Sequence, residues 1–214
     1  MTICLVTDRR RQPVVDQVRA AAEAGVDVCQ IRERDLGARA LAALVGESLA
    51  AVRGTRTRIV VNDRLDVALS CGADGVHLRA DSIPAAQART LAPEGFLIGR
   101  SVHGLDEARL AAAHVDYLIA GTAFSTASKP DQREWLGEAG LRAISEAVAV
   151  PVWAIGGVTP DTLAVVQASG ASGIAAIGLF AVAPAQMGAV VAHLRSIWHT
   201  AGSRSSIDTA KRGS

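Results

Sequence analysis

Short apolar runs alternate along the chain with longer segments of helical period. The short runs, rich in Val, Ile, Leu and Ala, are typical of strands buried on both faces, and they lie at 3–7, 26–32, 58–62, 75–78, 97–102, 117–124, 150–155 and 173–179. The longer segments carry apolar residues at helical spacing, and they lie at 14–24, 38–52, 66–71, 84–91, 105–113, 138–147, 161–169 and 185–198. Eight expected strands therefore alternate strictly with eight expected helices.

This alternation predicts an α/β fold, a single-domain parallel (β/α)8 TIM barrel. Such barrels typically take about 250 residues, and because this chain has 214, its loops must be short. A helix stop followed by a small polar residue recurs before every second expected strand, as in a barrel built of similar quarters. A doubly wound open sheet is the alternative. We expect the barrel in residues 1–199 and a flexible tail, rich in Ser, Gly, Lys and Arg, in 200–214.

Charge and composition narrow the classes of function. The net charge of +1 argues against a nucleic-acid-binding surface. Gly178, Pro184 and Gln186 interrupt the longest apolar tract, residues 173–192, so we expect no membrane span. Three cysteines without metal-ligand spacing indicate reduced thiols and a cytoplasmic protein. Association of two copies into a homodimer is left open.

Polar side chains cluster where the second expected strand ends. In a parallel barrel the chemistry lies at the carboxyl ends of the strands. Gln30, Arg32 and Arg34 alternate there, so they project from one face. Two guanidiniums on one face suit a phosphate or diphosphate. The alternative is a layer of ion pairs with Glu33 or Asp35 at the rim.

Two further polar groups follow the third and the sixth expected strands. Asn62 and Asp63 offer the oxygen ligands that Mg²⁺ prefers, although they also fit a plain strand-to-helix cap. Thr126, Ser128 and Lys129 share one loop, where two hydroxyls and an ammonium could close over a phosphoryl group or simply be solvated.

Glycines end the last two expected strands. Gly156 and Gly157 follow the strand at 150–155, and Gly178 lies near the end of the final strand. Glycine lets backbone N–H groups approach an anion closely, so this βαβ unit is the expected phosphate site. His77 and His103 lie near the ends of the fourth and fifth expected strands, where a histidine serves either the structure or the substrate.

Six segments in fixed order resemble the thiamine phosphate synthase family, including its TenI-like thiazole tautomerase branch. The segments are QIR (30–32), VNDR (61–64), GADGVHL (72–78), IGRSVH (98–103), TASKP (126–130) and AIGG (154–157). The resemblance extends from Thr7 to about Phe180, and the joint order of the segments is far more specific than any one of them. The chain is therefore identified as similar to that family over nearly the whole predicted barrel.

The resemblance implies a barrel that binds a thiazole phosphate. In the synthase, Mg²⁺-bound hydroxymethylpyrimidine diphosphate loses pyrophosphate, and the thiazole nitrogen captures the pyrimidine methylene carbon. Within the implied site, Gln30, Arg32 and Arg34 would bind the diphosphate. The full set of implied roles is catalysis for Arg32, Ser101 and Lys129, Mg²⁺ binding for Asp63, and substrate binding for Gln30, Arg34, Asn62, His77, His103, Thr122, Thr126, Ser128, Gly156, Gly157, Ile177 and Gly178.

Three departures from the family's pattern bear on activity. Arg34 stands where the synthase usually has Lys. Residues 79–82 read Arg, Ala, Asp, Ser instead of the usual Gly, Gln, Glu, Asp, so the second acidic metal ligand is missing unless Asp81 takes its place. Thr122 stands where the tautomerase branch has a catalytic His.

Two other functions therefore stay open beside the synthase. One is a metal-free, TenI-like tautomerase that shifts a proton with another base, for example His77 or His103. The other is a non-catalytic binder of thiamine intermediates. In all three cases the expected partners are phosphorylated pyrimidine and thiazole small molecules.

Overall fold

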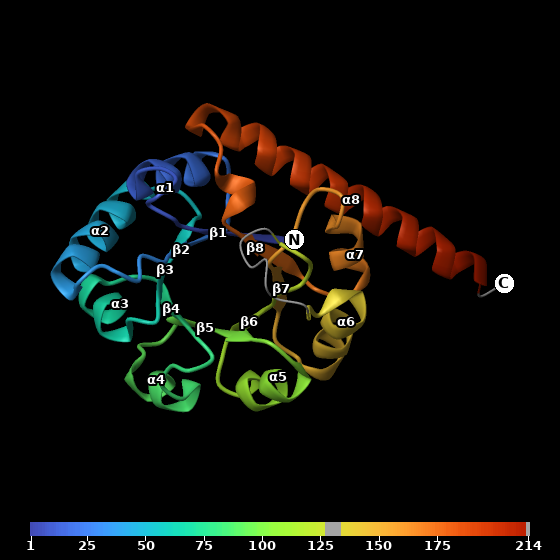
Figure 1. The fold of residues 1–214 in the computed structure, drawn as a ribbon, viewed down its shortest axis with the longest axis horizontal. Helices are drawn as coiled ribbons and strands as arrows, with labels where there is room; N and C mark the ends of the chain where they lie inside the picture. Colours follow the sequence, from blue (N-terminus) through green and yellow to red (C-terminus); the bar gives the residue numbers. More distant parts are fainter. Residues whose placement is uncertain (127–133, 213–214) are drawn as a thin grey trace.

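Eight parallel strands form a closed barrel in the order β1 to β8 (Figure 1). The computed structural model describes residues 1–126 and 134–212, with side chains up to 202. The strands are β1 (Thr2–Val6), β2 (Val28–Ile31), β3 (Arg58–Asn62), β4 (Gly75–Leu78), β5 (Leu97–Val102), β6 (Tyr117–Ala120), β7 (Val152–Ile155) and β8 (Gly173–Ala176). Pairing of β1 with β8 closes the ring, with Leu5 opposite Ala176. The predicted TIM barrel is confirmed, and the open sheet is wrong.

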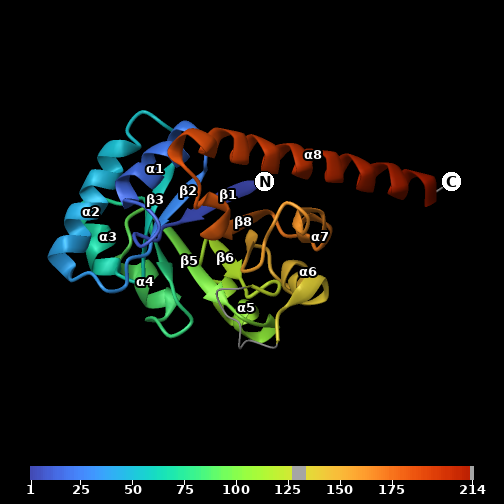
Figure 2. The ribbon, with the colours of Figure 1, turned by 45° about the horizontal axis from the view of Figure 1, so that its top comes forward.

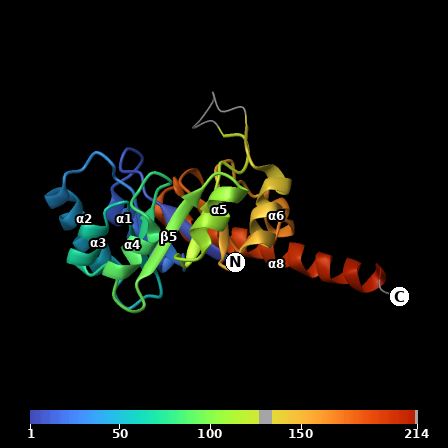
Figure 3. The same ribbon diagram turned by 90° about the horizontal axis from the view of Figure 1, so that it is seen from below.

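The helices surround the strands in the predicted alternation (Figure 1). They are α1 (Val14–Glu23), α2 (Ala38–Ala51), α3 (Leu65–Cys71), α4 (Ala85–Leu91), α5 (Leu105–Ala112), α6 (Gly137–Ala147), α7 (Leu163–Ala168) and α8 (Met187–Arg212), with the 3-10 turns η1 (Gly178–Phe180) and η2 (Pro184–Gln186) before α8. In the side view of Figure 3, the segments after β1, β2 and β6 rise on the same side of the molecule. The carboxyl ends of these strands thus share one rim.

Two strands, β6 and β8, end several residues earlier than their apolar runs predict. β6 ends at Ala120 and not at 124, because the following backbone turns to β7: Ala123 N–H donates to Ile155 O at 2.8 Å and Phe124 N–H to Gly156 O at 3.0 Å. β8 ends at Ala176 and not at 179, because its pairing with β1 stops there and the chain turns into η1.

Aromatic rings fill the inside of the barrel, over glycines on neighbouring strands. Tyr117 and Trp153 stack with ring centroids 4.0 Å apart within an apolar cluster that includes Cys4. A Cβ on Gly99 would lie 2.0 Å from Tyr117 Cζ, and one on Gly173 would lie 3.0 Å from Trp153 Cδ1. These glycines are therefore required by packing, since interiors leave few voids. A larger apolar layer joins the outer face of the strands to the helices.

Helix α8 covers the barrel and then continues beyond it (Figures 1 and 2). Its buried residues include Met187, Leu194 and Trp198. Arg195 donates to Met1 O at 3.1 Å and to Gly25 O at 2.7 Å, which fastens the helix to the start of the chain. The helix was expected to end at 198, and this is wrong because it runs to Arg212. Flexibility of 200–214 stays a prediction. In the described part of the chain, no helix is long and apolar enough to cross a membrane.

Candidate active site

Three buried polar side chains, together with the half-buried Ser101, form a layer above the apolar inside of the barrel. Gln30 on β2 donates from Nε2 to Asn62 Oδ1 on β3 at 3.0 Å. His77 on β4 and Ser101 on β5 are joined by a hydrogen bond of 2.9 Å between Nε2 and Oγ. Because buried polar groups are costly unless paired, these two pairs hold the polar ends of four strands together. The structure thus brings these four predicted site residues to one end of the barrel.

His77 is a neutral side chain at ordinary pH. Burial, followed by the positive charges of Arg32 and Arg100, lowers its pKa from 6.5 to about 3. Its ring stacks on Tyr117, with centroids 5.7 Å apart, and its Nδ1 makes no hydrogen bond within the described residues. A group with so low a pKa is a weak base near pH 7, because efficient general bases have a pKa near the working pH.

Arg32 and Arg34 bear positive charges at the rim without a carboxylate partner. Within residues 1–126 and 134–202, no carboxylate lies within ion-pair distance of either guanidinium. Burial and the like charge of Arg34 lower the pKa of Arg32. Arg34 is exposed and lies in a turn beyond the end of β2, so the predicted alternation stops at Arg32. An anionic ligand would relieve this crowding of charge.

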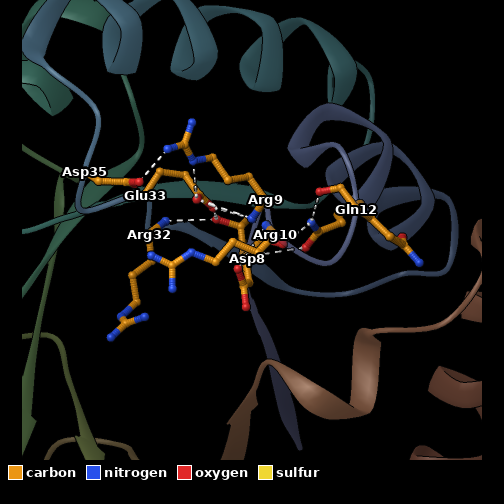
Figure 4. A network of polar contacts seen from close by, with 9 residues as sticks. Asp8, Arg9, Arg10, Gln12, Arg32, Glu33 and Asp35 are labelled. Atoms are coloured by element: carbon orange, nitrogen blue, oxygen red, sulfur yellow. Dashed lines mark hydrogen bonds and ion pairs between the residues drawn. The ribbon is translucent and has the colours of Figure 1, made fainter.

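Glu33 and Asp35 pair with Arg9, on the segment after β1, and not with the cations of β2 (Figure 4). The guanidinium of Arg9 lies 3.8 Å from Glu33 and also hydrogen-bonds Asp35. The alternative of an ion-pair layer formed by Arg32 and Arg34 is therefore wrong. Figure 4 shows the side chain of Arg32 leading away from this network.

A buried network that the sequence did not reveal fixes the backbone of Arg32 (Figure 4). Thr7 donates its hydroxyl to Glu33 Oε1 at 2.7 Å and accepts the backbone N–H of Arg32 at 2.9 Å. The backbone N–H of Arg9 also donates to Glu33, at 3.2 Å. Gln12 ties the same segment to Val182 O, beyond β8. The only sequence signal was an acid, Glu33, between two arginines at the end of an apolar strand.

The carboxylate of Asp63 is already engaged by side chains of the segment after β4. Ser82 donates its hydroxyl to Asp63 Oδ1, and the guanidinium of Arg79 lies 3.7 Å from Oδ2. Asp81 does not supply a second ligand, because Arg79 binds it at 2.6 Å. Among the described residues, no group of three or more His, Cys, Asp or Glu side chains could hold a metal ion. This arrangement does not fit a magnesium site built on two carboxylates.

The glycine pair after β7 makes room for the segment that follows β6. Gly156 and Gly157 have φ of 91° and 67°. A Cβ would lie 2.7 Å from Thr122 Cγ2 at the first, and 2.4 Å from Ser125 O at the second. Close contact with the segment after β6, through the Thr122 side chain at Gly156 and through backbone at Gly157, therefore accounts for both glycines, whether or not a phosphate also binds here. By contrast, a Cβ on Gly178 would meet no atom within 4 Å.

The remaining predicted site residues are dispersed or lie outside the described residues. His103 is exposed, and its Nδ1 hydrogen-bonds Gly121 O. Ile177 packs against the apolar inside of the barrel. Thr126 is half-buried at the end of the described segment after β6. Ser128 and Lys129 fall in 127–133, outside the described residues.

Comparisons with known proteins agree on one family. The family described as thiamine monophosphate synthase matches residues 3–180. A thiamine-phosphate synthase of Methanoregula boonei is 49% identical over 160 residues, 74% of each chain, and one of Moorella thermoacetica is 38% identical over 87% of this chain and 89% of its own. The solved thiamine phosphate pyrophosphorylase from Pyrococcus furiosus has a TM-score of 0.83 at 35% identity, covering 94% of this chain and 96% of its own. Since the family match spans all eight strands of the barrel, this chain belongs to the thiamine monophosphate synthase family.

Proposed function

We propose that this chain is a thiamine-phosphate synthase, a transferase of thiamine biosynthesis. It joins hydroxymethylpyrimidine diphosphate to thiazole phosphate and releases pyrophosphate. The observation that carries the proposal is the pair of guanidiniums, Arg32 and Arg34, that have no carboxylate partner in the described residues, in a chain 49% identical to a thiamine-phosphate synthase. Two cations at the carboxyl end of a barrel strand suit a substrate that carries a diphosphate.

The chemistry requires stabilisation of a leaving group. The bond between the pyrimidine methylene carbon and the diphosphate oxygen breaks, and the thiazole nitrogen supplies the electron pair of the new C–N bond. Negative charge gathers on the departing pyrophosphate, and fixed cations stabilise it most where they are already in place. We assign this role to Arg32 and Arg34, and also to Lys129, which the resemblance implies.

The polar layer would orient the pyrimidine. Gln30 lies two residues before Arg32, and Asn62 ends the neighbouring strand β3. Both are buried, and each retains polar atoms beyond their mutual hydrogen bond. Ser101, held by neutral His77, would contact the diphosphate. Gly157, Ile177 and Gly178 would hold the thiazole phosphate at the ends of β7 and β8.

The proposal assigns Mg²⁺ a smaller role than the family resemblance implies. The family resemblance implies the ion, and Asp63 is the ligand it would use. Because Ser82 and Arg79 engage this carboxylate, no step of the proposed reaction is assigned to a metal held by two protein carboxylates.

We also propose a cytoplasmic location, which the free thiols of Cys4, Cys29 and Cys71 support. A homodimer stays a prediction.

The tautomerase alternative lacks the histidine expected as its base. Thr122 replaces the histidine expected in that branch. Of the two substitutes, His77 has a pKa lowered to about 3, and His103 is exposed and bonded to a backbone carbonyl. These observations support the synthase over the tautomerase.

The purified full chain, incubated with both synthase substrates with and without Mg²⁺, tests the proposal. We expect equal amounts of thiamine phosphate and pyrophosphate. The parallel sample contains thiazole carboxylate phosphate in deuterated water, where proton exchange would reveal a tautomerase. Proton exchange in the second sample, with no thiamine phosphate formed in the first either with or without Mg²⁺, would refute the synthase. Absence of both activities would favour a non-catalytic binder.

A further inference from the structure

Arg79 places a positive charge between two carboxylates at the rim. It is the first residue after β4, and its guanidinium lies 3.7 Å from Asp63 Oδ2 and 2.6 Å from Asp81 Oδ2. Within the described parts of the chain, no other cation forms an ion pair with either acid. A divalent ion at Asp63 would therefore have to displace this guanidinium.

The segment that carries Arg79 is fastened on both sides. Arg100 on β5 donates to Ala80 O at 2.7 Å and to Ile83 O at 3.0 Å. Ser82 accepts the backbone N–H of Arg79 at 2.8 Å and donates its hydroxyl to Asp63 on the other side. These bonds connect the backbone that carries Arg79 to β3 and β5, and the ion pairs with Asp63 and Asp81 orient its guanidinium.

Arg79 lies at the same rim as the cations of the proposed diphosphate site, because it directly follows β4 as Arg32 directly follows β2. After burial and Arg34, the charge of Arg79 is a further cause that lowers the pKa of Arg32. The positive charges of Arg34 and Arg79 thus both act on Arg32. Like charges kept close together repel, and an anion bound among them would offset that repulsion.

We propose that Arg79 is a resident cation of the diphosphate site, which neutralises Asp63 and supplies there the charge that a Mg²⁺ ion would otherwise supply. Ser82 supports this replacement of Mg²⁺ by Arg79, because its hydroxyl contacts Asp63 at the position where the family usually has a second acid. The chain would then bind diphosphate without a metal at Asp63. That the anion is the diphosphate of the substrate rests on the proposed function.

Two calorimetric titrations of the full chain test this inference. One adds inorganic pyrophosphate to metal-free protein in EDTA, and the other adds Mn²⁺ without pyrophosphate or chelator. The variants are Arg79→Gln and Arg79→Lys. The matched control is Arg19→Gln, which removes another exposed Arg–Asp pair, within α1.

Arg79→Gln should change the two affinities in opposite directions. Loss of a charge-assisted contact should weaken pyrophosphate binding about tenfold or more. Release of Asp63 and Asp81 from their shared cation should strengthen Mn²⁺ binding about tenfold. Arg79→Lys, which keeps the charge, should stay near the wild type in both titrations, as should Arg19→Gln.

Opposite changes in the two affinities separate this role from a structural one, because a misfolded variant would lose both affinities. If Arg79→Gln misfolds, the titrations of Arg79→Lys test the inference instead. An unchanged pyrophosphate affinity in Arg79→Gln, or an unchanged Mn²⁺ affinity, would overturn the inference. A Lys variant that loses pyrophosphate binding while folded would also overturn it. Neither titration needs turnover, so a failure of the proposed synthase reaction is detected separately.

Discussion

Arg32 combines a fixed backbone with a guanidinium that has no carboxylate partner in the described residues. Thr7 accepts its N–H at 2.9 Å, while Glu33 and Asp35 are occupied by Arg9. This combination suits an anion site, since the charge is positioned in advance and is not neutralised internally.

Substitution of Arg32 by Ala should lower kcat/KM for synthesis about 100-fold or more, because one fixed donor to the leaving group is lost. Lys129→Ala should have a similar effect. Steady-state kinetics with both substrates provides the measurement, with Arg19→Ala as the control that keeps its activity. Full activity in either variant would refute the role assigned to that residue.

Substitution of Glu33 by Ala should lower the free energy of unfolding by about 1–3 kcal/mol, because the buried hydroxyl of Thr7 and the N–H of Arg9 lose their acceptor. Asp35→Ala, which removes the exposed partner of the same arginine, should leave the unfolding free energy unchanged. Urea denaturation distinguishes the two variants. Equal effects would mean that burial of the Glu33 network contributes nothing to stability.

His77 should make the protein less stable as the pH falls. The pKa of His77 is about 3 in the folded chain and ordinarily 6.5, so between these values the unfolded chain takes up a proton that the folded chain does not. Stability from this group is complete above about pH 6.5 and falls by at most about 1.4 kcal/mol per pH unit below it. Denaturation of the wild type and His77→Asn from pH 7 to 4.5 measures the difference in slope, and parallel curves would contradict the buried, neutral state.

The position of Gln30, Asn62 and His77 near strand ends was enough to predict that they lie at the rim, and the family resemblance added Ser101. Gln30, Asn62, His77 and Ser101 do form one polar layer, because parallel strands bring their carboxyl ends together. The partner of Glu33 was not predictable in this way. Arg9 is 24 residues away, and which carboxylate it reaches depends on the path of a loop rather than on strand period.

The segment after β6 depends on the glycine pair after β7. The phosphate site expected at Gly156 and Gly157 stays a prediction, and the structure adds a packing reason for both glycines: a Cβ would meet the Thr122 side chain at the first and the backbone of Ser125 at the second. Contacts between loops of different βα units have no periodic signal, so the apolar run 117–124 predicted a longer strand than β6.

Substitution of Gly157 by Ala should destabilise the protein by about 1–3 kcal/mol or more, because φ is 67° and a Cβ would lie 2.4 Å from Ser125 O. It should also impair synthesis by moving the segment that carries Thr126. Gly46→Ala is the matched control, since it is exposed within α2, meets no atom within 4 Å, and should stabilise by about 0.5–1 kcal/mol. Thermal denaturation gives both values, and a neutral Gly157→Ala would show that the loop adapts.

Closure of the whole molecule followed from the strict alternation of strands and helices. The filling of the barrel did not, because Gly99 and Gly173 make sense only beside Tyr117 and Trp153, which come from neighbouring strands. The length of α8 was also missed, since its polar second half carries no apolar period that indicates a packed helix. Neither the packing inside the barrel nor the length of α8 changes the positions of the rim residues.

A crystal structure of the protein with bound pyrophosphate tests most directly whether the rim cations hold the diphosphate. We expect pyrophosphate at the carboxyl ends of β2 to β5, with its oxygens hydrogen-bonded to the guanidinium of Arg32 and close to Arg34. Pyrophosphate bound away from Arg32, at any other end or face of the barrel, would contradict the assignment of this rim as the active site.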